Sequence, residues 1–133
     1  MIGVVLCSHN TLAEALLETT RMIVGDFPAC EAVSVRPGDG PDDVLARLRS
    51  AITAVDDGSG VLILCDMFGG TPSNLSLSLL GESVEVVTGA NLPMMLKLFT
   101  SRELPLTDAA CSVRDHGRDN VVVAGALLRR RAS

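Results

Sequence analysis

The sequence predicts an α/β fold: an open, doubly wound sheet of parallel strands in the order 2-1-3-4, with helices on both faces. Two features of the pattern indicate this class. Short, nearly continuous apolar runs alternate with segments whose apolar residues recur every three or four positions. The connections between them are short and rich in Gly, Pro and Asp. From the length of 133 residues we expect one domain over residues 1–133.

The first strand and helix are marked by a change of period. Residues 2–7 are an apolar run of the kind found in strands that are covered on both faces. Asn10 or Thr11 can cap the helix that follows, and Gly25 can end it. The apolar face of this helix is predicted to contain Leu12, Ala15, Leu16, Thr19 and Ile23.

The middle of the chain repeats this alternation. Residues 31–35 form a weaker strand, and residues 37–40 form a loop. A helix over residues 41–55 has Pro41 in its first turn. Its inward residues are predicted to be Val44, Leu45, Leu48, Ala51, Ile52 and Val55. Residues 61–65 are the clearest buried strand, and Asp66 ends it.

A Gly-Gly-Thr-Pro turn leads into the third helix, for which we predict Thr71 as the cap and Pro72 as the first helical residue. Residues 83–88 form the fourth strand, and Asn91 opens a fourth helix that runs through Phe99. The remaining predicted elements are a short helix over 107–115, a final strand over 121–124 and a solvated tail with arginines at 129–131.

Composition excludes several classes of function. The net charge of −5 argues against general nucleic-acid binding. Because the chain has no Trp or Tyr, it has no such rings on which a sugar or base could stack. No apolar run approaches the ~18 residues of a membrane span, and no basic leader is visible. Four cysteines without a CxxC pair indicate free thiols, so we expect a cytoplasmic protein.

The polar residues with chemical potential follow the strands. His9 comes after the first strand and Asp66 after the third. In the order 2-1-3-4 these strands are neighbours at the point where strand order reverses, which is where ligands bind in such sheets. We therefore expect His9 and Asp66 to lie side by side. A histidine whose one ring nitrogen is held by a carboxylate can act as a nucleophile through the other nitrogen.

The loops around this pair favour a phosphoryl group as the electrophile. Two helices start at the same edge, and helix N-termini attract phosphate. Gly69 and Gly70 let the backbone approach closely, and Thr71 and Asn10 add hydrogen-bond donors. Neither loop contains Lys or Arg, so a phosphoryl group held there by neutral donors could be passed on to a partner.

Each of these signals also has a structural interpretation. A histidine after a strand, an acid in a turn and a Gly-Gly-Thr-Pro helix entry all occur without function. A metal site built from Cys7, His9, Cys65 and Asp66 is disfavoured, because the two cysteines should point into the layers. The chain also lacks a P-loop and a dinucleotide fingerprint.

Three stretches of sequence resemble one family: VVLCSHN near the start, LILCDMFGGTPSN in the middle and VVTGANLPMML after it. Together they resemble the mannose-type (mannose/fructose/sorbose) EIIA component of the bacterial PEP-dependent sugar phosphotransferase system. The resemblance covers nearly the whole chain, and DMFGGTPSN is its most specific part. Many relatives have Thr and Gly on either side of the histidine, where this chain has Ser8 and Asn10.

The resemblance implies a phosphocarrier. His9 would accept the phosphoryl group of phospho-HPr, Asp66 would be its carboxylate partner, and Thr71 would be the hydroxyl of the phosphate-binding loop. The group would pass to a histidine of a IIB subunit on a separate chain, associated with the membrane components IIC and IID. No metal or cofactor would be needed, because the P–N bond of the donor is already activated. The family fold also implies a homodimer that exchanges the strand over residues 121–124.

Two other functions remain open at this point. In the first, the same phosphohistidine serves a regulatory module that controls a partner protein instead of sugar uptake. In the second, His9 and Asp66 form the general-base pair of a hydrolase that needs no partner protein.

Overall fold

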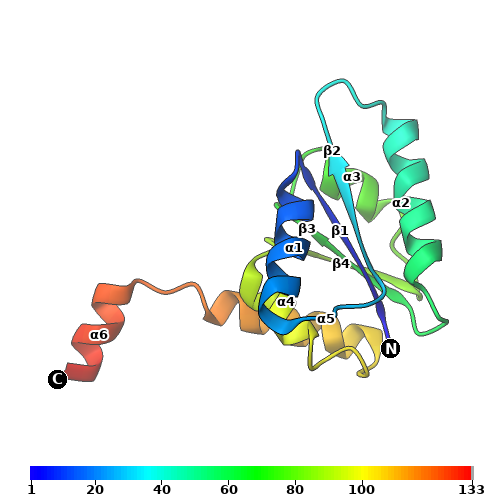
Figure 1. The fold of residues 1–133 in the computed structure, drawn as a ribbon. Coiled ribbons are helices and arrows are strands. Elements are labelled where there is room, and N and C mark those ends of the chain that lie inside the picture. Colours follow the sequence, from blue (N-terminus) through cyan, green and yellow to red (C-terminus); the bar gives the residue numbers. More distant parts are fainter. Residues whose placement is uncertain (133) are drawn as a thin grey trace.

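The computed structural model describes residues 1–132 and confirms the α/β fold with a four-stranded parallel sheet in the order β2-β1-β3-β4 (Figure 1). The elements, in chain order, are β1 (Gly3–His9), α1 (Leu12–Val24), β2 (Cys30–Val35), α2 (Pro41–Val55), β3 (Val61–Cys65), α3 (Thr71–Leu77), β4 (Val84–Thr88), α4 (Leu92–Leu98), α5 (Leu106–Asp119) and α6 (Ala124–Ala132).

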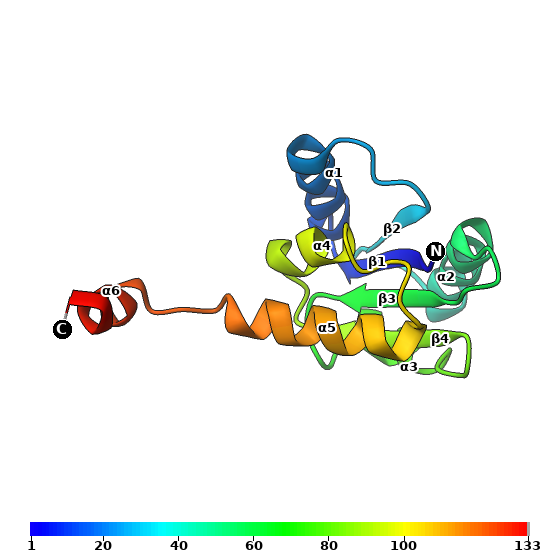
Figure 2. The same ribbon diagram turned by 90° about the horizontal axis from the view of Figure 1, so that it is seen from below.

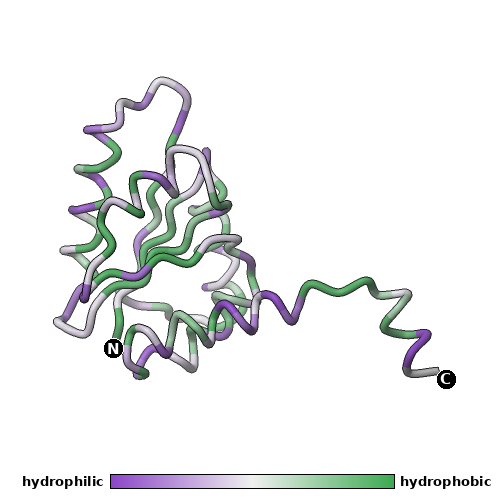
Figure 3. The backbone as a smooth tube through the Cα atoms, turned by 180° about the vertical axis from the view of Figure 1, so that it is seen from behind, coloured by the Kyte–Doolittle hydropathy of each residue, from purple (hydrophilic) through white to green (hydrophobic). Residues whose placement is uncertain are grey.

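Helices cover both faces of the sheet, so alternate residues of the central strands enter two separate cores. On one face, Leu6 and Leu64 pack with α1, α4 and α5. On the other, Val5 and Ile63 pack with α2 and α3. Figure 1 shows α1 and α4 on one side of the strands and α2 and α3 on the other, and Figure 3 shows that hydrophobic residues concentrate in the strands. Burial on both faces explains why β1 and β3 are continuous apolar runs.

The inward face of α1 differs from the prediction. Leu12 and Ile23 are exposed, whereas Ala13, Leu17 and Thr20 are buried against the sheet. Both sets follow helical spacing, so periodicity alone could not separate them. In α2, by contrast, Val44, Leu48, Ala51 and Val55 are buried as predicted.

The C-terminal part departs most from the prediction. Helix α5 is longer than expected on both sides, and no strand forms over residues 121–124 in the single chain. Instead an extended stretch leads to α6, which starts at Ala124 and projects away from the sheet (Figures 1 and 2). Ala, Leu and Arg are strong helix formers, which explains why the expected arginine tail is helical.

Candidate functional site

His9 and Asp66 meet at the carboxyl edge of the sheet. Cys7 of β1 is the register partner of Cys65 of β3, so the residues that follow these strands emerge next to each other. The Nδ1 atom of His9 lies 2.9 Å from Oδ2 of Asp66, and the backbone N–H of His9 donates to the same oxygen at 2.9 Å. The other carboxylate oxygen accepts the N–H of Met67 at 3.0 Å. The placement expected from strand order is therefore found.

The pair has a defined protonation pattern. Burial acts to raise the pKa of the Asp66 carboxyl, but the hydrogen bonds from the His9 backbone and ring and the charge of that ring outweigh it, so the pKa lies below its ordinary value. Asp66 is thus a carboxylate at neutral pH. A carboxylate oxygen only accepts hydrogen bonds, so Nδ1 carries a proton, and in the neutral ring Nε2 is the nitrogen with the free lone pair. The His9 side chain is 49% exposed, which leaves its ring accessible.

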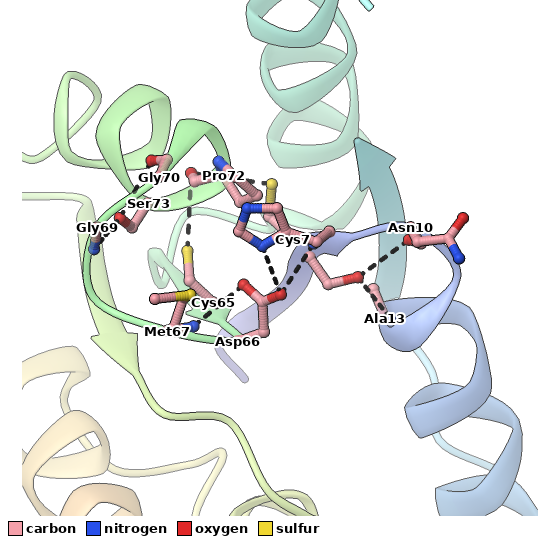
Figure 4. A network of polar contacts seen from close by, with 12 residues as sticks. Cys7, Asn10, Ala13, Cys65, Asp66, Met67, Gly69, Gly70, Pro72 and Ser73 are labelled. Atoms are coloured by element: carbon pink, nitrogen blue, oxygen red, sulfur yellow. Dashed lines mark hydrogen bonds and ion pairs between the residues drawn. The ribbon is translucent and has the colours of Figure 1, made fainter. Parts of the chain in front are cut away.

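Gly70 allows the loop after β3 to approach the free nitrogen of His9. Its φ is +87°, and a Cβ atom at this position would lie 3.0 Å from Nε2. Ser73 stabilises this turn, because its buried Oγ accepts the N–H of Gly69 at 2.8 Å. Figure 4 shows the loop that carries Gly69, Gly70 and Ser73, with Asp66 at its start. Only glycine gives this approach without a side chain against the ring.

Thr71 is not the helix cap that the sequence predicted. Gly70 occupies the cap position, Thr71 is the first residue of α3 and Pro72 the second, and no side chain caps this end. Gly70 has the left-handed φ that a sharp entry needs, which explains the shift by one residue. The hydroxyl of Thr71 is therefore not used as a cap, and the residue is exposed beside His9.

Asn10 and Thr11 do not cap α1 through their side chains either. The cap is supplied by Ser8, whose Oγ accepts the N–H of Ala13 at 2.7 Å and donates to the carbonyl of Asn10 at 3.2 Å. Asn10 has φ of +52°, a left-handed conformation that Asn tolerates better than most residues. Its backbone N–H is bonded to the carbonyl of Val35, so only its side chain remains to contact a ligand. Sequence reasoning missed the roles of Ser8 and Ser73.

An open groove of about 540 Å³ lies beside the ring of His9. Asn10 and Thr71 line it together with the loop that follows β2. This loop brings Arg36 to the groove, a residue that sequence reasoning did not include in the site. The signal was present, because β2 is the other neighbour of β1 in the predicted order and its loop must end at the same edge.

The two cysteines behind the site face α3 and are engaged there. The thiols of Cys7 and Cys65 lie 4.0 and 3.8 Å from the carbonyl oxygen of Pro72, and that of Cys65 lies 3.4 Å from Oγ of Ser76. Burial raises the pKa of Cys7 to about 12, so it stays a thiol. Within the described residues no three His, Cys, Asp or Glu side chains are grouped to hold a metal.

Comparison with known proteins supports one family. The family model described as "PTS system fructose IIA component" matches residues 3–113. The fructose-specific EIIA component of Bacillus subtilis is 32% identical over 105 residues, covering 77% of this chain and 72% of that protein. The structure of a mannose/sorbose-specific IIA subunit from Enterococcus faecalis has a TM-score of 0.84, is 29% identical and covers 92% of this chain and 93% of that one.

Two further relatives place the same domain in longer proteins. The mannose-specific EIIAB component of Escherichia coli K12 is 29% identical over 104 residues, which cover 77% of this chain but only 32% of that protein. The transcriptional regulatory protein LevR of Bacillus subtilis is 29% identical over 104 residues, which are 77% of this chain and 10% of LevR. The family match over most of the chain decides the assignment: this chain belongs to the EIIA family of the mannose/fructose/sorbose phosphotransferase systems.

Proposed function

We propose that this chain is a phosphocarrier that accepts a phosphoryl group from phospho-HPr on Nε2 of His9 and passes it to a histidine of a IIB subunit. The observation that carries this proposal is the hydrogen bond between Nδ1 of His9 and Asp66, which leaves Nε2 as the free nitrogen. Family membership supports the choice of donor and acceptor.

The transfer balances without a further reactant. The lone pair of Nε2 attacks phosphorus, the P–N bond of the donor breaks, and its electron pair returns to the donor ring. The proton on Nδ1 of His9 stays in the hydrogen bond to Asp66. The phosphorylated ring is then cationic, and the carboxylate of Asp66 stabilises that charge at close range. Transfer to IIB is the same step in reverse. Catalysis is therefore mainly positioning and electrostatics.

The oxygens of the phosphoryl group need donors next to Nε2. A Cβ at Gly70 would lie 3.0 Å from this nitrogen, and among the described residues the backbone N–H groups of Gly70 and Thr71 donate to no other group. The hydroxyl of Thr71 and the side-chain amide of Asn10 line the same groove. The N–H of Gly69 is bonded to Ser73, so we assign Gly69 the role of shaping the loop.

Phosphorylation with a matched pair of histidine variants tests the proposal. The chain has two histidines, His9 and His116, and His116 lies on α5 away from this groove. After mixing with phospho-HPr, the wild type and His116→Ala should carry acid-labile phosphate, and His9→Ala should carry none. Absence of label on the wild type, or undiminished label on His9→Ala, would overturn the phosphocarrier.

We also propose that residues 121–123 pair with β4 of a second copy, which would make the homodimer expected from the family. The residues Val121, Val122 and Val123 are 76%, 56% and 74% exposed, and β4 is an edge strand with a groove between it and α5. Unpaired edges and apolar extended segments favour such pairing. Light scattering at micromolar concentration should give a dimer, and a monomer would contradict this assignment.

A second candidate function is a phosphorylation-dependent regulatory module, and the likeness to LevR favours it specifically. In both functions His9 is phosphorylated, so the two differ in the next acceptor. Adding IIB from the same cells to the phosphorylated protein separates them. Loss of label from His9 with gain on IIB indicates transport, and label that stays on His9 in the presence of IIB indicates regulation.

The proposed carrier acts beside a membrane and not within it. No helix in the part of the chain that the structure describes is long and apolar enough to cross a bilayer. From family membership we propose that the protein works in the cytoplasm and that any association with IIC and IID is made through the IIB partner.

A further inference from the structure

The loop after β2 places a cation at the groove of His9. Val35, the last residue of β2, is the register partner of His9, and its carbonyl accepts the N–H of Asn10 at 2.7 Å. Arg36 follows directly and lines the groove with His9 and Thr71. Neighbouring strands lie ~4.8 Å apart, so the backbone of Arg36 begins close to that of His9. It is the only Lys or Arg among the described residues that line this groove.

The acid nearest to Arg36 in its own loop is already engaged. Oδ2 of Asp39 accepts the backbone N–H of Arg36 at 2.8 Å and Nη2 of Arg47 at 2.9 Å. The backbone bond, followed by the hydrogen bond from Arg47, lowers the pKa of Asp39 in spite of the opposing effect of burial, and the charge of Arg36 adds a smaller contribution. Asp39 therefore fixes the turn and pairs with Arg47. Within the described chain, the guanidinium of Arg36 makes no hydrogen bond or ion pair.

Resting on the proposed function, we propose that Arg36 binds the oxygens of the phosphoryl group while it is carried on Nε2 of His9. A guanidinium matches phosphate oxygens through paired N–H donors and is always charged. The group it would meet carries negative charge in a site whose nearest fixed ion is the carboxylate of Asp66. Without a cation, the phosphoryl group would bind next to that carboxylate with neutral donors alone. Arg36, which lines the groove beside the ring of His9, supplies the missing positive charge.

A donor that needs no protein contact isolates this role. Phosphoramidate is a small molecule that transfers its phosphoryl group to histidine, with the P–N bond broken and ammonia as the leaving group. We compare the rate of His9 phosphorylation by phosphoramidate and by phospho-HPr in the wild type, Arg36→Gln and Arg36→Lys. The matched control is Arg49→Gln, because Arg49 is an exposed arginine of α2 that does not line the groove.

We expect Arg36→Gln to slow labelling by both donors about 10-fold. Loss of one oxyanion donor costs ~10²–10³ in a preorganised, water-excluded site, and this groove is open. Arg36→Lys should recover part of the rate, and Arg49→Gln should match the wild type. The ³¹P resonance of phospho-His9 should also shift in Arg36→Gln and not in Arg49→Gln, a readout that a merely structural role would not move.

Three results would overturn the inference. If Arg36→Gln labels at the wild-type rate with both donors, Arg36 does not bind the group. If labelling slows with phospho-HPr alone, Arg36 contacts the donor protein and not the phosphoryl group. If Arg49→Gln slows labelling as much as Arg36→Gln, the effect is one of general surface charge. Failure of the phosphocarrier itself looks different, because wild-type His9 would then take no label from phospho-HPr.

Discussion

The amino and carboxyl edges of the sheet differ in how far their polar side chains are buried and hydrogen-bonded. At the amino edge, Arg102 is only 6% exposed, and its guanidinium donates to the carbonyls of Ile2, Pro28 and Ala29 and lies over the ring of Phe27. At the carboxyl edge, His9 is half exposed, and its Nε2 has no hydrogen-bond partner in the described chain. One edge satisfies its polar groups, and the other leaves a nucleophilic nitrogen free.

This contrast indicates that Arg102 at the amino edge contributes mainly to folding stability, and that His9 and Asp66 at the carboxyl edge contribute mainly to phosphoryl transfer. A buried cation that saturates three backbone carbonyls links the amino terminus, the segment before β2 and the segment after α4. Removing it takes away the arginine donors of those carbonyls, although that of Ala29 still accepts the N–H of Val4, and leaving a buried carbonyl such as that of Ile2 without a donor is costly. The His9–Asp66 pair, whose ring is half exposed, contributes less to folding. Substitutions of Arg102 should therefore lower stability and spare phosphoryl transfer, and those of His9 and Asp66 should slow transfer with little effect on stability.

The largest expected effect is that of Asp66→Ala on the rate of phosphoryl transfer. Without the carboxylate, the ring of His9 loses its orientation and the stabilisation of its positive charge, and we expect a rate about 10- to 1000-fold lower. The rate of labelling by phospho-HPr measures this. The matched control is Asp57→Ala at the amino edge. Like Asp66, Asp57 is a hydrogen-bonded carboxylate, and the bonds from Ser59 and the terminal amine lower its pKa to about 2. Equal rates in Asp66→Ala and wild type would remove Asp66 from the mechanism.

Arg102→Met should give the complementary result. It keeps much of the apolar stem but removes the guanidinium donors to the carbonyls of Ile2 and Pro28 and its contact with Phe27, so we expect a loss of about 3 kcal/mol in the free energy of unfolding. Urea denaturation measures this loss. Arg49→Met, at an exposed position on α2, should change stability by less than about 0.5 kcal/mol. If Arg102→Met folds but transfers the phosphoryl group slowly, the amino edge also affects transfer, and the proposed difference between the two edges is wrong.

Gly69 and Gly70, in the loop after β3, allow two neighbouring positions of the carboxyl edge to be compared for their effect on the labelling rate. Gly70→Ala and Gly69→Ala both place a side chain at positive φ, which costs ~1–2 kcal/mol. Only at Gly70 does the new Cβ meet the ring of His9, because nothing lies within 4 Å of a Cβ at Gly69. We expect about 10-fold slower labelling in Gly70→Ala and a near-normal rate in Gly69→Ala. Similar rates in the two variants would show that the close approach of Gly70 has no role.

The smallest expected effect is that of Asp66 on the pH dependence of the free energy of unfolding. Because the folded-state pKa of Asp66 is lowered, this group stabilises the fold above its unfolded pKa of ~3.9 and loses that contribution as pH falls through the folded value. The difference in unfolding free energy between wild type and Asp66→Asn should be on the order of 1 kcal/mol or less at pH 7. Urea denaturation at pH 7 and at pH 3 should show that difference shrinking. A difference that grows toward pH 3 would have the wrong sign.

The sequence predicted the frame of the site better than its details. The apolar runs of β1 and β3 and the order 2-1-3-4 place His9 beside Asp66, because both follow from burial and topology. Ser8 and Ser73 were not identified, since their bonds cross turns whose conformation depends on φ values such as that of Asn10. Arg36 was missed because it comes from a neighbouring strand and not from the loops that carry the motif.

The C-terminal segment shows a different kind of error. Three consecutive valines favour a strand, and that propensity predicted one over residues 121–124. A strand needs a neighbour, and in the single chain these residues have none, while Ala124 starts a helix. Local preference therefore located an extended apolar segment correctly but could not say whether it is paired.

The central claim is that Asp66 holds one nitrogen of His9 so that the other carries the phosphoryl group. NMR of the protein labelled with ¹⁵N-histidine and phosphorylated by phospho-HPr tests it most directly, because coupling to ³¹P identifies the bonded nitrogen. We predict coupling to Nε2 of His9, with the Nδ1 proton retained. Coupling to Nδ1 of His9, or to either nitrogen of His116, would contradict the account.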